Sequence, residues 1–470
     1  MNRLGGVAAM FALLAGCAHV RSAVRDSAEV VALAQLEARE SANDAAILLA
    51  FHATTRTLQD AWAASNPTSS SFARSVLLAR SSESRHAEAI PYLAGYLPQL
   101  DDSEGVAAAI PVLSAAGRHD DATALAWAAA QAFESDRQTF LAQYYRALAS
   151  DASRMDMTEL ELTRESGHSL DPFRGSSSVI FRAFDAEHEI MGAWKPHQSA
   201  RHQSYRGEIA TYRLCAMLQC DVLMPRTRLA WMTEQQFYAL TGLDEGDDTS
   251  FYARHSDVIW IEHEGQRLLP GLIKDWVPRF SRFPIEYRNT WEEWLEQDEE
   301  DLASMRDQPL RRGLRDFRDR SRGFYSQLCG LAGTTTTYDL AHQISDLHLI
   351  DALINNFDRY QGDWPGMNTH FTEGQLLSID NGASFSLPEE FSNRTTQRRL
   401  ERIERFSRQT IDALRWMPRD AARDIMLPDS PWHDDESERF DEFWQRRSNV
   451  LAHVDELIEE YGEDAVLVFP

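Results

Sequence analysis

Apolar positions follow two different patterns in the two parts of the chain. Between about residues 45 and 149, short apolar runs alternate with polar turns, a pattern typical of packed helices. Near Gly167 the pattern changes. Val179–Phe184 is rich in β-branched and aromatic residues, and after a polar turn Glu189–Trp194 forms a second such run, which predicts a β-hairpin. The chain is therefore expected to join an α-helical domain to an α+β domain.

The first part is expected to span residues 18–165, as a tether followed by an α-helical domain. Within it, the stretch from Gly105 to Ala126 resembles a helical hairpin of the tetratricopeptide sort. The pattern does not recur at a fixed period, so a solenoid is not predicted. The expected role of these helices is to act as a spacer or to bind a protein partner.

The second part mixes predicted helices and strands. Tyr205–Leu218 has helical spacing, Asp221–Ala230 is strand-like, and Leu268–Pro278 is an apolar connector interrupted by glycine and proline. An apolar helical stripe then leads to Asp358; it consists of Ile344, Leu347, Ile350, Leu353, Ile354 and Phe357. From Thr396 onward the pattern predicts helices, with a break near Pro428.

Composition limits the possible partners. The chain has 470 residues, of which 43% are hydrophobic and 26% charged, as in globular proteins with a substantial core. This length suggests two or three domains. The net charge of −26 argues against nucleic acid as a partner, because nucleic-acid-binding surfaces are basic.

The N-terminus carries a targeting signal. Arg3 precedes the apolar run Gly5–Leu14, which ends in Leu-Ala-Gly-Cys17. This run is too short to span a bilayer and is typical of a signal peptide. Residues 1–17 resemble a bacterial lipoprotein signal, which implies cleavage before Cys17 and its lipidation, for example with palmitate. Ala18 at the next position favours the outer membrane of the cell envelope. An uncleaved buried helix is the alternative.

Three cysteines remain if Cys17 carries lipid: Cys215, Cys220 and Cys329. An odd number in an oxidising compartment leaves at least one unpaired. One disulfide is possible, and the sequence leaves its pairing open.

Candidate chemistry lies at the ends of two predicted apolar elements. The helical stripe ends at Asp358, a loop with Asn368 follows, and an apolar strand then ends at Asp380. An Asp at a helix end can orient a hydroxyl or accept its proton, and Asp and Asn oxygens suit Mg²⁺ or Mn²⁺. Structural capping is the alternative for these residues taken alone. A nucleophile elbow and a zincin helix are both absent from the sequence.

Polar residues upstream fit a phosphate site. Gly175, Ser176, Ser177 and Ser178 open the predicted hairpin, where small residues let backbone N–H groups approach a phosphate. Lys195 ends its second strand, and Glu208 begins the following helix. A strand lysine paired with a helix glutamate is a common way to contact phosphates in kinases.

These motifs together resemble a known family. Lys195-Pro and the stretch Tyr205-Arg-Gly-Glu208-Ile-Ala-Thr-Tyr, followed by Phe-Asp358-Arg and Asp380-Asn-Gly, are similar to the secretory-pathway kinases of the Golgi casein kinase and four-jointed group. The similarity to phosphatidylinositol kinases and HipA-type kinases is more distant. The resemblance implies a two-lobed atypical protein-kinase-like fold. Its N-lobe would span residues 166–278 and its C-lobe residues 279–430, with a C-terminal helical segment over 431–470.

The resemblance also implies roles for individual residues. Lys195 would contact phosphate, Glu208 would position that lysine or a metal ion, and Asp358 would be the catalytic aspartate. Asp380, with Asn368, would hold Mg²⁺ or Mn²⁺. The connector Leu272–Val277, including Lys274 and Trp276, would lie beside the adenine of ATP.

The expected activity is ATP-dependent phosphorylation of a hydroxyl on a protein or glycan in the bacterial cell envelope. The alternative is a catalytically inactive kinase fold that acts as a binding lipoprotein. Tyr360 stands where many relatives have histidine, and the loop before Asn368 is longer than theirs. Neither change removes a charged catalytic group, which favours the enzyme.

Overall fold

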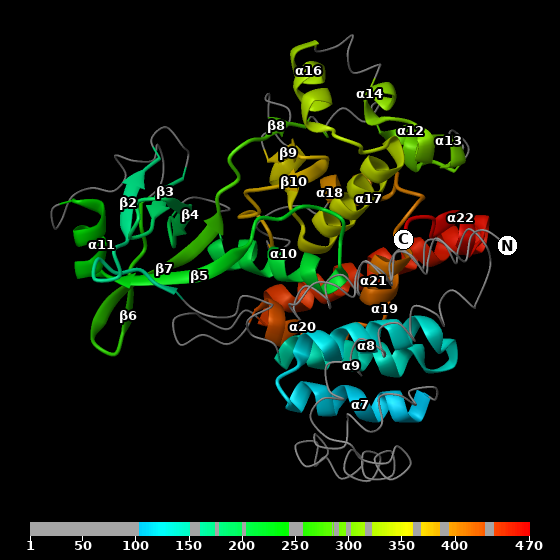
Figure 1. Cartoon of the computed structure of the whole chain (residues 1–470), viewed down its shortest axis with the longest axis horizontal. Helices are drawn as coiled ribbons and strands as arrows, with labels where there is room; N and C mark the ends of the chain where they lie inside the picture. Colours follow the sequence, from blue (N-terminus) through cyan, green and yellow to red (C-terminus); the bar gives the residue numbers. More distant parts are fainter. Residues whose placement is uncertain are drawn as a thin grey trace, which may run out of the picture. The chain divides into compact units, whose positions relative to one another are not determined.

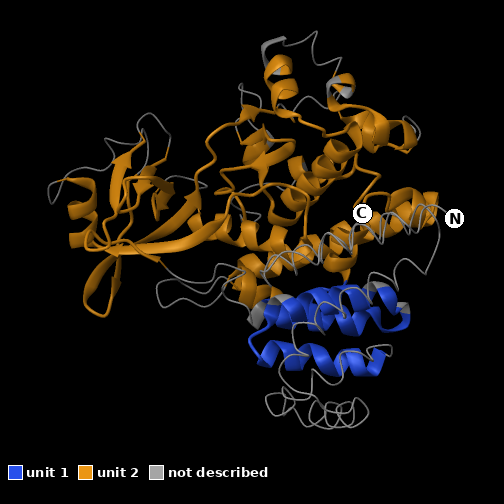
Figure 2. Ribbon diagram, viewed as in Figure 1, with its two compact units in different colours: residues 1–154, 416–421, 470 blue, residues 155–415, 422–469 orange. Residues whose placement is uncertain are grey.

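A computed structural model of the chain describes most of the residues after position 102. It falls into two compact units (Figure 2): residues 1–154 with 416–421 and 470, and residues 155–415 with 422–469. The predicted signal with Cys17, the tether and the first helical runs lie outside the described residues. The described ranges are 103–150, 160–173, 178–199, 204–243, 257–283, 285, 291–297, 302–314, 322–360, 368–385, 394–427 and 437–470.

Within residues 103–150 of the first unit the chain forms three α-helices (Figure 1): α7 Ser103–Ala115, α8 His119–Ala132 and α9 Arg137–Ser150. They pack on one another through many buried alanines together with large aromatic side chains such as Trp127 and Tyr144. Gly117 turns α7 into α8 with a φ of 72°, a conformation that glycine adopts without a steric penalty. Nowhere in the described ranges is a helix both long enough and apolar enough to cross a bilayer.

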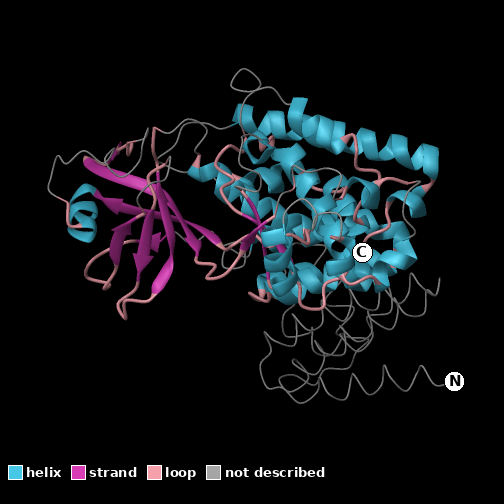
Figure 3. Ribbon diagram, turned by 90° about the horizontal axis from the view of Figure 1, so that it is seen from above, coloured by secondary structure: helices cyan, strands magenta, loops and turns pink. Residues whose placement is uncertain are grey.

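The second unit contains a seven-stranded sheet (Figures 1 and 3) with the strand order β1-β5-β7-β4-β3-β2, to which β6 adds by pairing with β7. All neighbours are antiparallel except β1 and β5. The apolar side chains of this sheet form a core around Trp194, Phe181 and Phe237. The strands are β1 Leu160–Glu161, β2 Ser169–Pro172, β3 Phe181–Phe184, β4 Ile190–Pro196, β5 Thr227–Thr233, β6 Ile261–His263 and β7 Gln266–Asp275.

The predicted hairpin is confirmed as β3 and β4, but the predicted connector Leu268–Pro278 is wrong. Most of it belongs to β7, which lies between β4 and β5. Pro270 has no N–H to donate. It is tolerated because its backbone faces the end of β4, where Pro196, paired with Gly271, is the last residue of the strand. The carbonyl of Pro270 accepts a hydrogen bond from the N–H of His197, 2.7 Å away, so only one ladder bond is lost.

Helix α10 spans Tyr205–Leu218, as its spacing predicts, and packs on β5 and β7. It begins at Ser204, whose side chain accepts a hydrogen bond from the N–H of Gly207, and ends at Gln219 in the left-handed conformation. A disulfide joins Cys215 in the last turn of this helix to Cys220 just past its end, and Cys329 is a free cysteine. The helix thus has a defined start, close to Glu208.

Helix α17, Thr337–Ile354, is the central helix of the second unit, and nearly all of its residues are buried. A capping box formed by Thr336 and Asp339 starts it, and Asn355 ends it in the left-handed conformation. A 3₁₀ turn, η6 Phe357–Tyr360, follows and carries Asp358. The chain then forms the hairpin β9 Thr369–Thr372 and β10 Gln375–Ser378, which a third strand, β8 Ser281–Arg282, joins through β9.

Other helices of the second unit pack on α17, and the unit contains both helices and strands (Figure 3). The mixed α+β class expected from the sequence is therefore confirmed. The remaining helices of the described residues are α11 Glu234–Thr241, α12 Glu292–Leu295, α13 Leu302–Asp307, α14 Leu310–Gly313, α16 Arg322–Leu331, α18 Arg394–Leu400, α19 Arg408–Arg415, α20 Arg419–Met426, α21 Ser437–Tyr461 and α22 Glu463–Val466.

His348 on α17 makes the stability of the second unit depend on pH. Its ring is 1% exposed, and its centre lies 4.5 Å from that of Trp291. Burial, with Arg399 and Arg359 nearby, holds the pKa of His348 well below 6.5. The folded chain therefore binds fewer protons than the unfolded chain below about pH 6.5, so stability is lost as the pH falls from there.

Replacing His348 with glutamine should flatten this acid limb. We expect urea denaturation between pH 8 and pH 5 to show a smaller loss of unfolding free energy for His348→Gln than for the unmodified chain. Equal losses would show that His348 is not the group that takes up the proton.

Candidate active site

Lys195 lies at the buried end of β4 and contacts two carboxylates. Its Nζ is 2.6 Å from Oε1 of Glu208 and 2.6 Å from Oδ1 of Asp380. The residue is 5% exposed. Burial alone would lower the pKa of Lys195, but the charges of Asp380 and Glu208 outweigh it and raise the pKa above the usual lysine value. Lys195 is therefore a fixed cation between two acids.

Glu208 lies in the first turn of α10 and is 2% exposed. A second lysine, Lys274 on β7, donates to its Oε2, so each oxygen of this carboxylate contacts one ammonium group. Burial would raise the pKa of Glu208, but Lys195 and Lys274 together lower it below the usual glutamate value. The buried carboxylate is therefore charged and held on both sides.

Asp380 lies two residues past Ser378, the last residue of β10, and takes a left-handed conformation with a φ of 53°. Non-glycine residues are uncommon in this region, although aspartate enters it more readily than most. The side chain is 35% exposed, far more than Lys195 or Glu208. Two residues later, the carbonyl of Gly382 accepts from the N–H of Ser204, which ties this loop to the start of α10.

Asp358 and Asn368 form a second pair of polar groups. Nδ2 of Asn368 donates to Oδ2 of Asp358 across 3.2 Å. The carbonyl of Asn368 accepts from the N–H of Ile379 at 3.3 Å, which extends the pairing of β9 with β10 by one step. Asn368 is thus placed beside the residue that precedes Asp380, and its side chain contacts the predicted catalytic aspartate.

Arg359 links the segments that carry Asp358, Asn368 and Asp380. Its side chain is fully buried, and its Nε lies 2.6 Å from Oδ2 of Asp351 on α17. The guanidinium also donates to the carbonyl of Asn368, to Oγ of Ser378 at 2.9 Å and to Oδ1 of Asn381 at 2.7 Å. One arginine therefore links the central helix, η6 and both ends of the β9–β10 hairpin.

The structure brings together most, but not all, of the residues singled out from the sequence. Lys195, Glu208 and Asp380 are in direct contact, and Asp358 contacts Asn368. Lys274, expected beside adenine, forms an ion pair with Glu208, and Trp276 lies just past β7 with 39% of its surface exposed. Ser178 is buried at the start of the hairpin, whereas Gly175, Ser176 and Ser177 lie outside the described residues.

Sequence reasoning missed the structural role of Arg359 and of its partner Asp351. The Asp358-Arg359 dipeptide was interpreted only as a motif, although the spacing of eight residues between Asp351 and Arg359 crosses a helix end. No local pattern marks such a pair, because the partners meet only after α17 stops at Asn355. The pairing of Lys274 with Glu208 was missed because β7 was not recognised as a strand.

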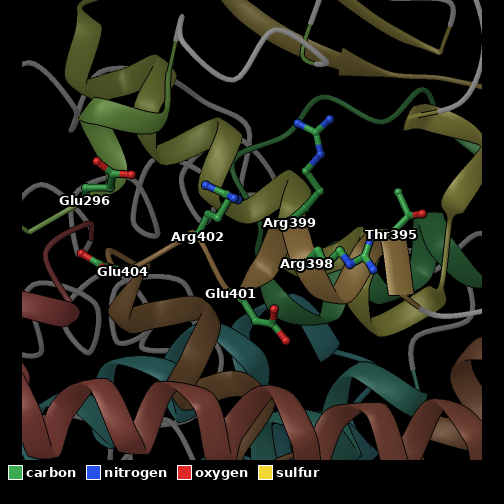
Figure 4. A pocket seen from close by; sticks show the side chains of 7 residues that line it. All are labelled: Glu296, Thr395, Arg398, Arg399, Glu401, Arg402 and Glu404. Carbon is green, nitrogen blue, oxygen red and sulfur yellow. The ribbon is translucent and has the colours of Figure 1, made fainter.

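A charged cavity of about 700 Å³ opens elsewhere on the second unit (Figure 4). Part of its charge is neutralised locally, because Arg402 pairs with Glu292 and the side chain of Glu404 accepts from the N–H of Gln297 at 2.7 Å. None of the site residues discussed above lines it. The lining residues are Glu296, Thr395, Arg398, Arg399, Glu401, Arg402 and Glu404.

The solved structures that are similar to this chain include a Golgi casein kinase and a hydra Fam20 protein. The first is described as "Crystal structure of the golgi casein kinase". It is 14% identical to this chain, and the match covers 68% of this chain and 79% of that one, with a TM-score of 0.40. The second, "The structure of hydra Fam20 with sugar", is 12% identical, with coverages of 70% and 91% and a TM-score of 0.39. No family model and no curated protein matches the sequence. Similarity at this level transfers no residue roles to this chain.

Proposed function

We propose that the second unit is an ATP-dependent phosphotransferase with a two-lobed, kinase-like fold, which phosphorylates a hydroxyl group of a protein or glycan. The observation that carries this proposal is the bridge made by Lys195. A buried strand lysine contacts both a helix glutamate and an aspartate that follows a hairpin, at 2.6 Å each. Kinases use such a lysine–glutamate pair to hold the nucleotide phosphates, beside an aspartate that holds the metal ion.

The proposed roles follow from the positions of the groups. Lys195 binds phosphate oxygens of ATP, and Glu208 keeps its ammonium group in place. Asp358 accepts or orients the proton of the attacking hydroxyl, a task for which its half-buried carboxylate is suited. Asn368 fixes the Asp358 side chain through the 3.2 Å hydrogen bond. The reaction breaks the bond between the γ-phosphorus of ATP and its bridging oxygen and forms a phosphate ester.

The residues present fit a divalent cation that arrives with the nucleotide. Among the described residues, no group of three or more His, Cys, Asp or Glu side chains could hold a metal ion by itself. Mg²⁺ commonly binds to one or two protein carboxylates and to the substrate phosphates, so a full protein cage is not needed. Asp380, a third exposed, and Asn368 would hold the ion, and the ion would neutralise phosphate charge.

The same proposal includes a place in the cell. The signal-like residues 1–17 support a lipoprotein anchored through Cys17 in the bacterial cell envelope, with the outer membrane favoured by Ala18. The helical first unit would then space the enzyme from the membrane or bind a protein partner. The mass of the mature N-terminal peptide tests the anchor, because an unmodified Cys17 or an uncleaved leader would contradict it.

Replacing Asp380 with asparagine should abolish metal-dependent nucleotide binding. ATP with Mn²⁺ at about 100 times its Kd is expected to stabilise the unmodified chain by about 2.7 kcal/mol. Asp380→Asn removes the proposed metal ligand, so most of this stabilisation, measured as a shift in Tm, should disappear. Asp307→Asn, a change at an exposed aspartate of α13, is the matched control and should keep the full shift.

Two results would contradict the proposal. One is a chain that ATP and Mn²⁺ neither stabilise nor label. The other is a shift in Tm that is unchanged in Asp380→Asn. Stabilisation without any transfer would instead favour an inactive kinase fold that binds nucleotide.

A further inference from the structure

Glu208 is held by two lysines rather than one. Lys195 contacts Oε1 at 2.6 Å, and Lys274 contacts Oε2. All three side chains are largely buried, with exposed fractions of 7% for Lys195, 12% for Lys274 and 2% for Glu208. Lys195 also contacts Asp380, whereas Lys274 pairs with Glu208.

The register of the sheet explains this arrangement. Ala193 on β4 lies opposite Lys274 on β7, so their side chains share one face of the sheet. Lys195 is two residues further along β4 and projects from the same face, because successive side chains of a strand alternate. The two lysines are therefore diagonal neighbours across the β4–β7 pair. Helix α10 packs on β7 and brings Glu208 to them.

The second lysine changes what Glu208 can do. With Lys195 alone, one oxygen of a buried carboxylate would lack a partner, which costs free energy and leaves the carboxylate free to turn. With Lys274 on Oε2, both oxygens are bound and the orientation of the carboxylate is set. The Lys195 ammonium group is then held in one position, next to the more exposed Asp380.

We propose that Lys274 is a positioning residue for the reaction, acting on Lys195 through Glu208 and not by contact with the nucleotide. This role rests on the proposed phosphotransferase function. Because a misplacement of about 1 Å can cost roughly 100-fold in rate, loss of Lys274 should lower transfer markedly. The loss should fall on kcat more than on the KM for ATP, since Lys195 itself remains.

A double-mutant cycle tests this directly. The measured quantity is the rate of phosphate transfer from ATP with Mn²⁺, for the unmodified chain, Lys274→Met, Glu208→Gln and the double variant. We expect Lys274→Met to lower the rate roughly 10- to 100-fold. The double variant should be no slower than Glu208→Gln alone, because both changes disable the same contact. Lys274→Arg, which can still bind the carboxylate, should recover most of the rate.

The outcomes separate the possibilities. Additive losses would show that Lys274 acts independently of Glu208, as a direct phosphate contact would, and would overturn the proposal. A rate of Lys274→Met within about twofold of the unmodified chain would also overturn it, while leaving the proposed function intact. If the unmodified chain transfers no phosphate, both the role of Lys274 and the phosphotransferase function are contradicted. If Lys274→Met does not fold, Lys274→Gln takes its place in the cycle with the same criterion.

Arg182→Met provides the matched control. Arg182 lies on the neighbouring strand β3 and pairs with Asp171 at the surface, with 39% of its side chain exposed. Its replacement removes a basic group and an ion pair from the same sheet without touching Glu208. The rate of transfer should therefore stay unchanged in this variant.

Discussion

Asp358→Asn is expected to lower phosphate transfer from ATP by about 10²- to 10⁴-fold, the usual contribution of a positioned acid or base. The reason is local. Asparagine keeps the size of the side chain and its contact with Asn368, but it cannot take a proton from the attacking hydroxyl. Binding of ATP with Mn²⁺ should be retained, because Lys195, Glu208 and Asp380 are untouched. The check is a comparison of the transfer rate with the ATP-induced shift in Tm for the same variant.

Asp307→Asn again serves as the control for the loss of a carboxylate in the second unit. A transfer rate of Asp358→Asn close to that of this control would contradict the assignment of Asp358. Loss of both transfer and nucleotide binding would indicate that Asp358 holds the loop together rather than acting on the hydroxyl.

Arg359→Met should give the largest loss of stability of any single change discussed here. The replacement removes the guanidinium that neutralises the buried Asp351 carboxylate, and it removes the donors to Asn368, Ser378 and Asn381. Breaking a buried ion pair in this way costs about 3–5 kcal/mol. Urea denaturation of the variant measures the loss of unfolding free energy.

A surface arginine provides the comparison. Arg402 pairs with Glu292 but has 46% of its side chain exposed, so Arg402→Met should cost no more than about 1 kcal/mol. Combining Arg359→Met with Asp351→Asn should be less destabilising than the sum of the two changes, because each removes the same pair. A loss below about 1 kcal/mol for Arg359→Met would show that the buried network does not hold the site.

Much of the local structure could be predicted from the sequence. The hairpin of β3 and β4, helix α10 and helix α17 all carry local sequence signals, in residues near one another. The chain order of Lys195, Glu208, Asp358 and Asp380 also predicted that these residues belong to one site. In the structure Lys195 lies between Glu208 and Asp380, although the positions of these residues are up to 185 apart in the chain.

The strand β7 and the contacts of Arg359 could not be predicted, because they depend on residues far away in the sequence. Pro270 and Gly271 argue against a strand, and β7 forms because β4, β5 and β6, which are distant in the sequence, all pair with it. Once β7 is a strand, the register places Lys274 beside Glu208 and not in a connector. In the same way, Arg359 meets Asp351 and Asn381 only because α17 stops at Asn355 and the hairpin folds back. These are long-range contacts, and no window of a few residues contains them.

The most direct test of the phosphotransferase account is the fate of labelled ATP. Purified chain is incubated with Mn²⁺ and ATP labelled either at the γ-phosphorus or at the α-phosphorus, and label bound to protein or released is followed with time. The account predicts transfer of γ-label and none of α-label, with the γ-signal lost in Asp358→Asn. Transfer of α-label would show nucleotidyl transfer instead, and no transfer of either label would contradict the account.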